Sequence, residues 1–293
     1  GTVTGVQTCA LPIFQGLGVS HACHSGLRSR VAGMLCMAWT ASTASMEGPT
    51  TQPRVLGELA VQPLFPVALG QVQLAPDPLD TALQLQAIAA LRGEVDSNPD
   101  PGCAWTGDLH GVWQLHHHPA FSKLIDQLLV HARTYLQQLG FDLDQVALHI
   151  QRCWPVVSGW DQVVGRHHHP NAHLSAVYYL NGDGSGLQGC LRLYPQRQLN
   201  ELVPGLAVGH GGPLVASQSG SVGWNQPWID VAPQAGLLVL FPSALEHAVL
   251  PNGDPDDSRF SISLDLVLTA PPLAPGDASP EYLAPHPSHW QAV

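Results

Sequence analysis

RFSISLDLVL (259–268) is the last of five short apolar runs that decide the fold. The four runs before it are VALHIQRCW (146–154), LSAVYYL (174–180), GCLRLYP (189–195) and GLLVLFP (236–242). Segments rich in Gly, Pro, Asn and Asp separate them. Short apolar runs punctuated by turn residues are typical of strands in a β-sandwich or barrel.

The residues of this last run alternate in polarity. Side chains of a strand point to opposite faces in turn, so Arg259, Ser261, Ser263 and Asp265 share one face. That face meets either solvent or a pocket, and we favour the pocket. An arginine there can bind a carboxylate through two parallel hydrogen bonds, and a serine hydroxyl can donate to the same group.

Helical spacing appears only in the first half of the chain. Residues 79–93 and 119–140 both carry apolar side chains three and four positions apart, and a glycine closes each segment. In the second of them the apolar stripe consists of Phe121, Leu124, Ile125, Leu128, Leu129, Ala132, Leu136 and Leu139. One or two further strands are expected in 55–75. The sequence therefore predicts a mainly β domain with helices towards its N-terminus.

Composition limits the class of protein. The 293 residues are 45% hydrophobic and 11% charged, which excludes a disordered chain. The net charge of −11 argues against general nucleic-acid binding, which needs clustered cations. No apolar run reaches the ~18 residues of a membrane helix. The six cysteines match neither a C-x2-C metal site nor a compact disulfide framework, so we expect free thiols and a cytoplasmic location.

Residues 1–45 differ in composition from the rest. They contain no Asp or Glu, but three of the six Cys and two of the three Met. We expect 1–45 to be a non-native or leader segment outside the fold. A signal peptide is the alternative for this segment. The domain is expected to span 46–270, followed by a Pro-rich tail at 271–293.

Histidine is unusually frequent, at 16 residues, and it is the commonest metal ligand. Three histidines stand together directly before LSAVYYL. On an extended segment His167 and His169 point to the same side and His168 points away. A third ligand has to come from elsewhere, and His247, which follows GLLVLFP, is the best candidate. His168 remains as an alternative ligand, and a surface histidine run is the alternative to a metal site.

Three stretches in this order resemble the 2-oxoglutarate- and Fe(II)-dependent oxygenase superfamily. They are HHHPNAHLSAVYYLNG (167–182), GLLVLFPSALEHAVLPN (236–252) and RFSIS (259–263). The pattern is most similar to a bacterial and phage branch with an H-x-H-P-N motif, and it runs from about 59 to 269. The resemblance implies a double-stranded β-helix, the jelly-roll architecture of cupins. It also implies Fe(II) as the cofactor and 2-oxoglutarate as the cosubstrate.

The resemblance also implies roles for single residues. His167 and His247 match the iron-binding histidines. His169 stands where the superfamily usually has Asp or Glu, so Asp161 or Asp183 remain alternatives for the third ligand. Arg259 and Ser261 match the residues that bind the distal carboxylate of 2-oxoglutarate. We expect Tyr178 to donate to the same carboxylate, with Tyr179 as the alternative. Beyond the metal site no catalytic residue is expected.

The implied reaction is that of a dioxygenase, which hydroxylates a substrate and releases succinate and CO2. The substrate is not readable from the sequence; a small molecule, an amino acid or a protein side chain would all fit. Two alternatives remain. One is a cupin-like metal enzyme that does not use 2-oxoglutarate, such as a thiol dioxygenase or an isomerase. The other is a non-catalytic β-sandwich that binds a partner.

Overall fold

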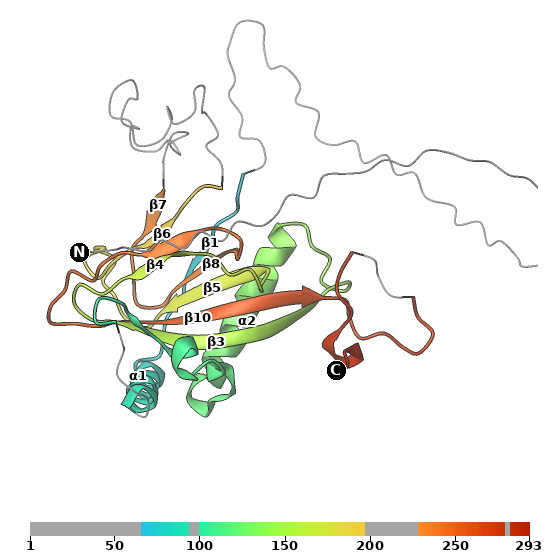
Figure 1. Cartoon of the computed structure of the whole chain (residues 1–293), viewed down its shortest axis with the longest axis horizontal. Coiled ribbons are helices and arrows are strands. Elements are labelled where there is room, and N and C mark those ends of the chain that lie inside the picture. Colours follow the sequence, from blue (N-terminus) through green and yellow to red (C-terminus); the bar gives the residue numbers. More distant parts are fainter. Residues whose placement is uncertain (1–65, 94–99, 197–227, 279–281) are drawn as a thin grey trace, which may run out of the picture. The chain divides into compact units, whose positions relative to one another are not determined.

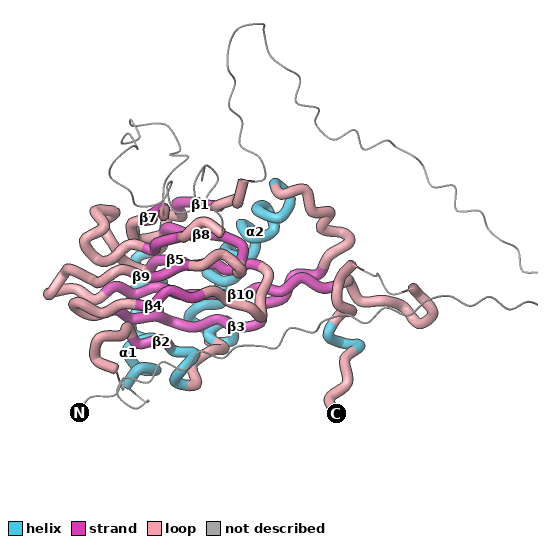
Figure 2. The backbone as a smooth tube through the Cα atoms, turned by 45° about the horizontal axis from the view of Figure 1, so that its top comes forward, coloured by secondary structure: helices cyan, strands magenta, loops and turns pink. Residues whose placement is uncertain are grey.

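The computed structural model describes residues 66–93, 100–196, 228–278 and 282–293. In these segments ten strands form two sheets, and every pair of neighbouring strands is antiparallel. The larger sheet has the order β1-β8-β5-β10-β3-β2 and the smaller sheet has the order β4-β9-β6-β7. Figure 1 and Figure 2 show these strands running alongside one another. The expected leader segment 1–45 lies outside the described residues.

The strands of the larger sheet are β1 (Gly70–Gln73), β2 (Trp105–Thr106), β3 (Ala147–Ser158), β5 (Leu174–Tyr179), β8 (Leu237–Pro242) and β10 (Arg259–Thr269). Those of the smaller sheet are β4 (Val164–His167), β6 (Leu191–Leu193), β7 (Ile229–Val231) and β9 (His247–Val249).

The order of strands defines the architecture. From β3 onward the chain passes back and forth between the sheets, so that β3, β5, β8 and β10 lie in one and β4, β6, β7 and β9 in the other. Eight antiparallel strands divided in this way make a jelly roll. The expected double-stranded β-helix is therefore confirmed, and it places the ends of β4, β9 and β10 around one space between the sheets.

Two helices accompany the sheets, α1 (Pro78–Gly93) and α2 (Ser122–Gln138), and both fall where the sequence predicts them. The apolar stripe of α2 packs against the outer face of the larger sheet, with Leu128 and Ile125 in the same buried cluster as Leu264 and Leu240 (Figure 1). Short 3-10 turns cover Gly107–His110, Leu115–His117, Pro119–Phe121 and Pro287–His289. No described helix is both long enough and apolar enough to cross a membrane.

Leu128→Ala is expected to lower the free energy of unfolding by about 2–5 kcal/mol, because the side chain is only 2% exposed and its loss leaves a cavity beneath the sheet. Val130, on the opposite side of α2, is 60% exposed, so Val130→Ala should change stability by no more than about 0.5 kcal/mol. Urea denaturation of both variants measures the difference. Equal stabilities would mean that α2 does not pack on the sheet as described.

Candidate metal centre and ligand pocket

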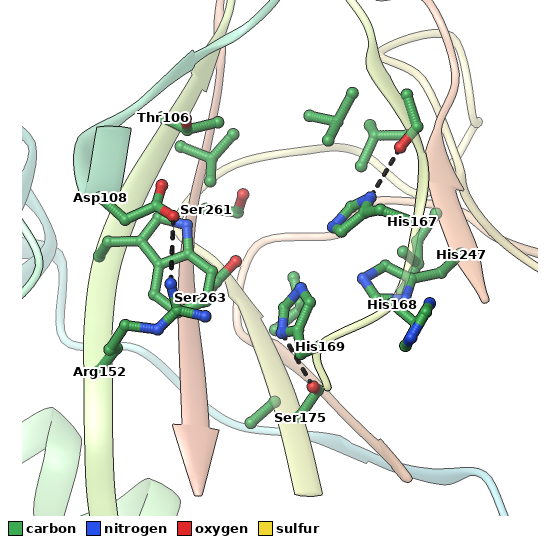
Figure 3. A pocket seen from close by; sticks show the side chains of 18 of the residues that line it. Thr106, Asp108, Arg152, His167, His168, His169, Ser175, His247, Ser261 and Ser263 are labelled. Atoms are coloured by element: carbon green, nitrogen blue, oxygen red, sulfur yellow. Dashed lines mark hydrogen bonds and ion pairs between the residues drawn. The ribbon is translucent and has the colours of Figure 1, made fainter. Parts of the chain in front are cut away.

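A cavity of about 470 Å³ lies between the two sheets. Its walls carry both groups that the sequence singles out, the histidines and the polar face of β10. The lining includes His167, His169, His247, Arg259, Ser261 and Ser263. Figure 3 shows the histidines on one side of this space and Ser261 and Ser263 on the other. The prediction that the polar face of β10 lines a pocket is thus met by the geometry.

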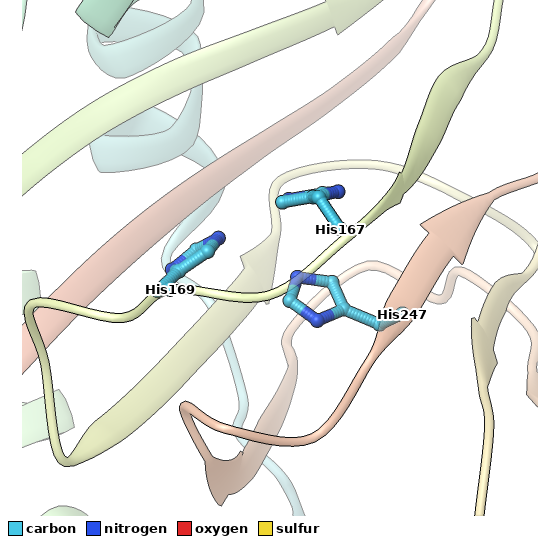
Figure 4. A group of neighbouring side chains, drawn as sticks. All are labelled: His167, His169 and His247. Atoms are coloured by element: carbon cyan, nitrogen blue, oxygen red, sulfur yellow. The ribbon is translucent and has the colours of Figure 1, made fainter. Parts of the chain in front are cut away.

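The three histidines come from the end of β4, from the segment that follows it and from the start of β9, which is adjacent to β4. His167 ends β4 and pairs directly with His247, the first residue of β9, while His169 follows two positions after His167. One ligand atom of each side chain lies within 4.8 Å of the other two. The ring centres of His167 and His247 are 4.3 Å apart (Figure 4). The structure therefore brings together the three side chains expected to bind metal.

Hydrogen bonds fix the same tautomer in each ring. Nδ1 of His167 lies 2.7 Å from the carbonyl oxygen of Gly165, and Nδ1 of His247 lies 2.9 Å from that of Leu245. A carbonyl oxygen can only accept, so both Nδ1 atoms must carry the proton. Nδ1 of His169 faces the Asp265 carboxylate at 2.5 Å and donates likewise. All three Nε2 atoms keep a free lone pair, which is the form that binds a metal ion.

Burial favours the same neutral state. It lowers the pKa of His167, and it lowers the pKa of His247 to about 3, because the charged form would be desolvated. At neutral pH neither imidazole has to lose a proton before it binds a cation. Imidazole ligands suit divalent transition metals, Fe(II) among them, so this donor set fits the metal that the sequence implies.

The alternative ligands do not join the group of three histidines. His168 is exposed and falls outside the group of three, although it also borders the cavity. Asp161 is exposed at a turn with a positive φ of 59°, and exposed Asp183 accepts a hydrogen bond from the backbone of Ser185. Neither carboxylate joins the histidine group, which is the one group of three or more such side chains in the described residues that could hold a metal ion.

Arg259 reaches the cavity from the first position of β10 and is 1% exposed. Its Nη1 donates to the carbonyl oxygens of Gln188 and Gly189, at 3.1 and 2.9 Å, and its Nη2 donates to Ser158 Oγ. All three acceptors are neutral, and Nε has no partner in the described part of the chain. Burial lowers the pKa of Arg259, yet a guanidinium stays charged in proteins. A buried cation of this kind fits a carboxylate ligand.

Tyr178 does not reach this pocket, which corrects the prediction. In the sheet Tyr178 pairs with Ile262 and lies in the core beneath α2, whereas Tyr179 pairs with Ser261. Residues directly opposite each other in an antiparallel pair share a face, so Tyr179 joins Ser261 on the cavity side. Burial raises the pKa of Tyr179 to about 12, which keeps its phenol protonated as a donor.

Tyr179→Phe is expected to weaken 2-oxoglutarate binding about 2- to 10-fold, the effect of one neutral hydrogen bond. Tyr178→Phe, on the other face of β5, should leave the affinity unchanged. Calorimetric titration of both variants with 2-oxoglutarate, with metal bound and oxygen excluded, measures this. A larger loss in Tyr178→Phe than in Tyr179→Phe would contradict the register described above.

The sequence alone did not reveal the surroundings of His169. His169 contacts Asp265 and Ser175, and Asp265 in turn contacts Arg152. The same wall of the cavity also includes Trp154 and Asp108. The alternation of β10 does place Asp265 on the cavity face. No signal in the sequence, however, pairs it with a histidine on another segment.

The chain is similar to known proteins in part of its sequence and in its fold. Residues 152–265 match the protein family described as "Putative 2OG-Fe(II) oxygenase". No curated protein matches the chain. Among solved structures, the chain is similar to the non-heme α-ketoglutarate-dependent epimerase SnoN from nogalamycin biosynthesis, at 14% identity over 75% of this chain and 91% of that one, with a TM-score of 0.48.

Two further solved structures are similar to this chain. One is an oxidoreductase of the 2OG-Fe(II) oxygenase family from Burkholderia pseudomallei, at 19% identity over 68% of this chain and 84% of that one, with a TM-score of 0.41. The other is a Pseudomonas putida prolyl-4-hydroxylase, at 21% identity over 69% and 92%, with a TM-score of 0.42.

Proposed function

We propose that the chain is a 2OG-Fe(II) oxygenase, as the family match over residues 152–265 suggests, and that it hydroxylates its substrate in the cavity between the two sheets. Fe(II) and 2-oxoglutarate are the cofactor and cosubstrate of that family. When bound, they supply the oxidising power: one oxygen atom of O2 enters the substrate, the other enters succinate, and CO2 is released.

One observation carries the proposal. Three imidazoles with free Nε2 atoms share a cavity with a buried guanidinium that has no carboxylate partner among the described residues. A site for a divalent metal and a site for an anion therefore lie in the same small space. 2-Oxoglutarate needs both, because one end of it chelates the metal and the other end is a free carboxylate.

The residues of this chain have distinct tasks in the proposal. His167, His169 and His247 would hold the metal, which leaves room for the cosubstrate to bind it as well. Arg259 pairs with the distal carboxylate, and Ser261 and Tyr179 donate to it. Apolar side chains around them, including Val177, Leu191 and Phe241, keep water away from the reacting centre and strengthen the electrostatic contacts.

The all-histidine ligand set favours a second candidate. A cupin-like metal enzyme that does not use 2-oxoglutarate, such as a thiol dioxygenase, would employ the same three imidazoles without a carboxylate. It would give no task to Arg259, whose charge would remain buried without an anion. For this reason we rank it below the oxygenase.

Formation of succinate tests the proposal. The full chain is incubated with Fe(II), 2-oxoglutarate, ascorbate and O2, and succinate is measured by chromatography, with His247→Ala as the background. We expect succinate to form slowly even without the natural substrate and to require both Fe(II) and O2. Succinate at the level of His247→Ala, together with no measurable binding of 2-oxoglutarate, would contradict the proposal and favour the second candidate.

A further inference from the structure

Asp265 is a fully buried carboxylate in the middle of β10. Its Oδ1 accepts the hydrogen bond from His169 Nδ1 at 2.5 Å. Its Oδ2 accepts from Nε and Nη2 of Arg152, at 3.0 and 2.5 Å. The side chain thus stands between one of the three cavity histidines and a cation.

Sheet register fixes this arrangement. Asp265 pairs with Arg152 of β3 on one side and with Ser175 of β5 on the other, so the three side chains project from one face of the sheet. Ser175 Oγ donates to Ser243 at 2.9 Å. It also lies 3.2 Å from His169 Nδ1 and accepts a second hydrogen bond from the N–H that donates to Asp265. The ring of His169 is therefore held from two neighbouring strands, and Figure 3 shows its contact with Ser175.

The three histidines differ in what holds their Nδ1 protons. His167 and His247 donate to neutral carbonyl oxygens, whereas His169 donates to a carboxylate. A carboxylate partner draws the proton away from the ring and makes the opposite nitrogen a stronger, more anionic ligand. His169 is also the residue that stands where the superfamily usually has Asp or Glu.

We propose that Asp265 acts through His169 to give the metal centre the negative charge that a carboxylate ligand would otherwise give. Two histidines and one carboxylate leave a divalent ion with a net charge of +1, and three neutral histidines leave it with +2. Asp265 restores the lower value without touching the metal, so it is a positioning residue. This inference rests on the proposed function, because it assumes that the triad binds the metal.

The charges around Asp265 support this role. Arg152 pairs with Asp265 but also approaches Asp108, with 3.6 Å between Nη1 and Oδ2. One arginine facing two carboxylates leaves the group with one negative charge in excess. Arg152 holds the Asp265 carboxylate in place, and Asp108 offsets part of the positive charge of the arginine, so Arg152 does not cancel the negative charge behind His169 completely.

Asp265→Asn tests the inference, because it keeps the size of the side chain and removes the charge. We expect Fe(II) binding, titrated without oxygen, to weaken about 10- to 100-fold, and the Fe(III)/Fe(II) potential to rise. Glu246→Gln is the matched control: it removes a charge beside His247 in the sequence, but from a half-exposed side chain paired with Arg166. The control should bind Fe(II) like the parent.

A double variant separates charge from structure. His169→Asp combined with Asp265→Asn moves the carboxylate from behind the histidine into the ligand position. We expect it to bind Fe(II) more tightly than Asp265→Asn alone and to have a potential closer to that of the parent. A merely structural role of Asp265 would not be rescued in this way.

A measurement on the unaltered protein covers the case in which the variants do not fold. With Zn(II) bound and histidine labelled with 15N, the Nδ1 proton of His169 should resonate furthest downfield of the three, since it alone faces a carboxylate. A parental affinity and potential in Asp265→Asn, or three equivalent Nδ1 protons, would overturn the inference. Failure of the parent to bind any metal would instead overturn the proposed function.

Discussion

Arg259→Ala is expected to weaken 2-oxoglutarate binding at least about 100-fold, while Fe(II) binding changes little. The guanidinium is buried, and its loss leaves the distal carboxylate of the cosubstrate desolvated and unpaired, which costs about 3 kcal/mol or more. Calorimetric titration of the metal-loaded protein without oxygen measures both affinities.

A second variant distinguishes charge from geometry at this position. Arg259→Lys keeps the positive charge but loses the planar fork that holds Gln188, Gly189 and Ser158. It should recover part of the affinity lost in Arg259→Ala. If Arg259→Ala binds 2-oxoglutarate as the parent does, the cation serves only to fasten the strands around Gly189.

His247→Ala is expected to abolish tight metal binding, with a loss of at least about 100-fold in affinity and no succinate formed. The side chain is the most deeply buried of the three histidines, and no other described residue stands ready to replace it. With only two imidazole ligands, the metal would lack one strong bond and its site would be open on that side. Anaerobic titration with Fe(II), or with Co(II) as a spectroscopic substitute, measures the affinity.

His168→Ala is the control for this prediction. His168 is exposed and lies between two cavity histidines in the sequence, but its ring is not part of the group. Its removal should leave metal affinity unchanged. If His168→Ala lowers affinity as strongly as His247→Ala, the segment binds metal in a different register from the one described.

The alternation of polar and apolar residues in β10 was sufficient to predict its two faces. Shifting a strand by one residue moves every side chain to the opposite face. The alternation in the sequence therefore shows by itself which residues of β10 share a face. The same reasoning separated His168 from its neighbours. The double-stranded β-helix needed more, because strand order depends on contacts far apart in the chain, and the resemblance to a family provided it.

Tyr178 shows where the sequence alone was insufficient. Both tyrosines of β5 suit a strand, and the neighbours of each are apolar or aromatic, so composition does not mark the cavity side. Only the pairing of Tyr179 with Ser261 decides it, and that pairing joins two segments about 80 positions apart. The contact between Asp265 and His169 was unpredictable for the same reason.

Strand lengths were predicted unevenly. The strands β4 and β9 have four and three residues, too few for a periodic pattern, and neither was predicted. By contrast, β3 runs past Pro155, where the prediction ended. Cys153 donates its N–H outward to Trp113, so two positions later the nitrogen of Pro155 also points away from β10. Pro155 has no N–H to donate, but at this position its absence removes no hydrogen bond to β10.

The most direct test of the account is a spectroscopic titration of the full chain with 2-oxoglutarate, with Fe(II) bound and oxygen excluded. Chelation of the metal by the keto acid produces a metal-to-ligand charge-transfer band in the visible range. We predict that the band appears, saturates at one 2-oxoglutarate per chain and is absent in His247→Ala. Tight Fe(II) binding without any band would contradict the account, because the three histidines would then hold a metal that 2-oxoglutarate does not reach.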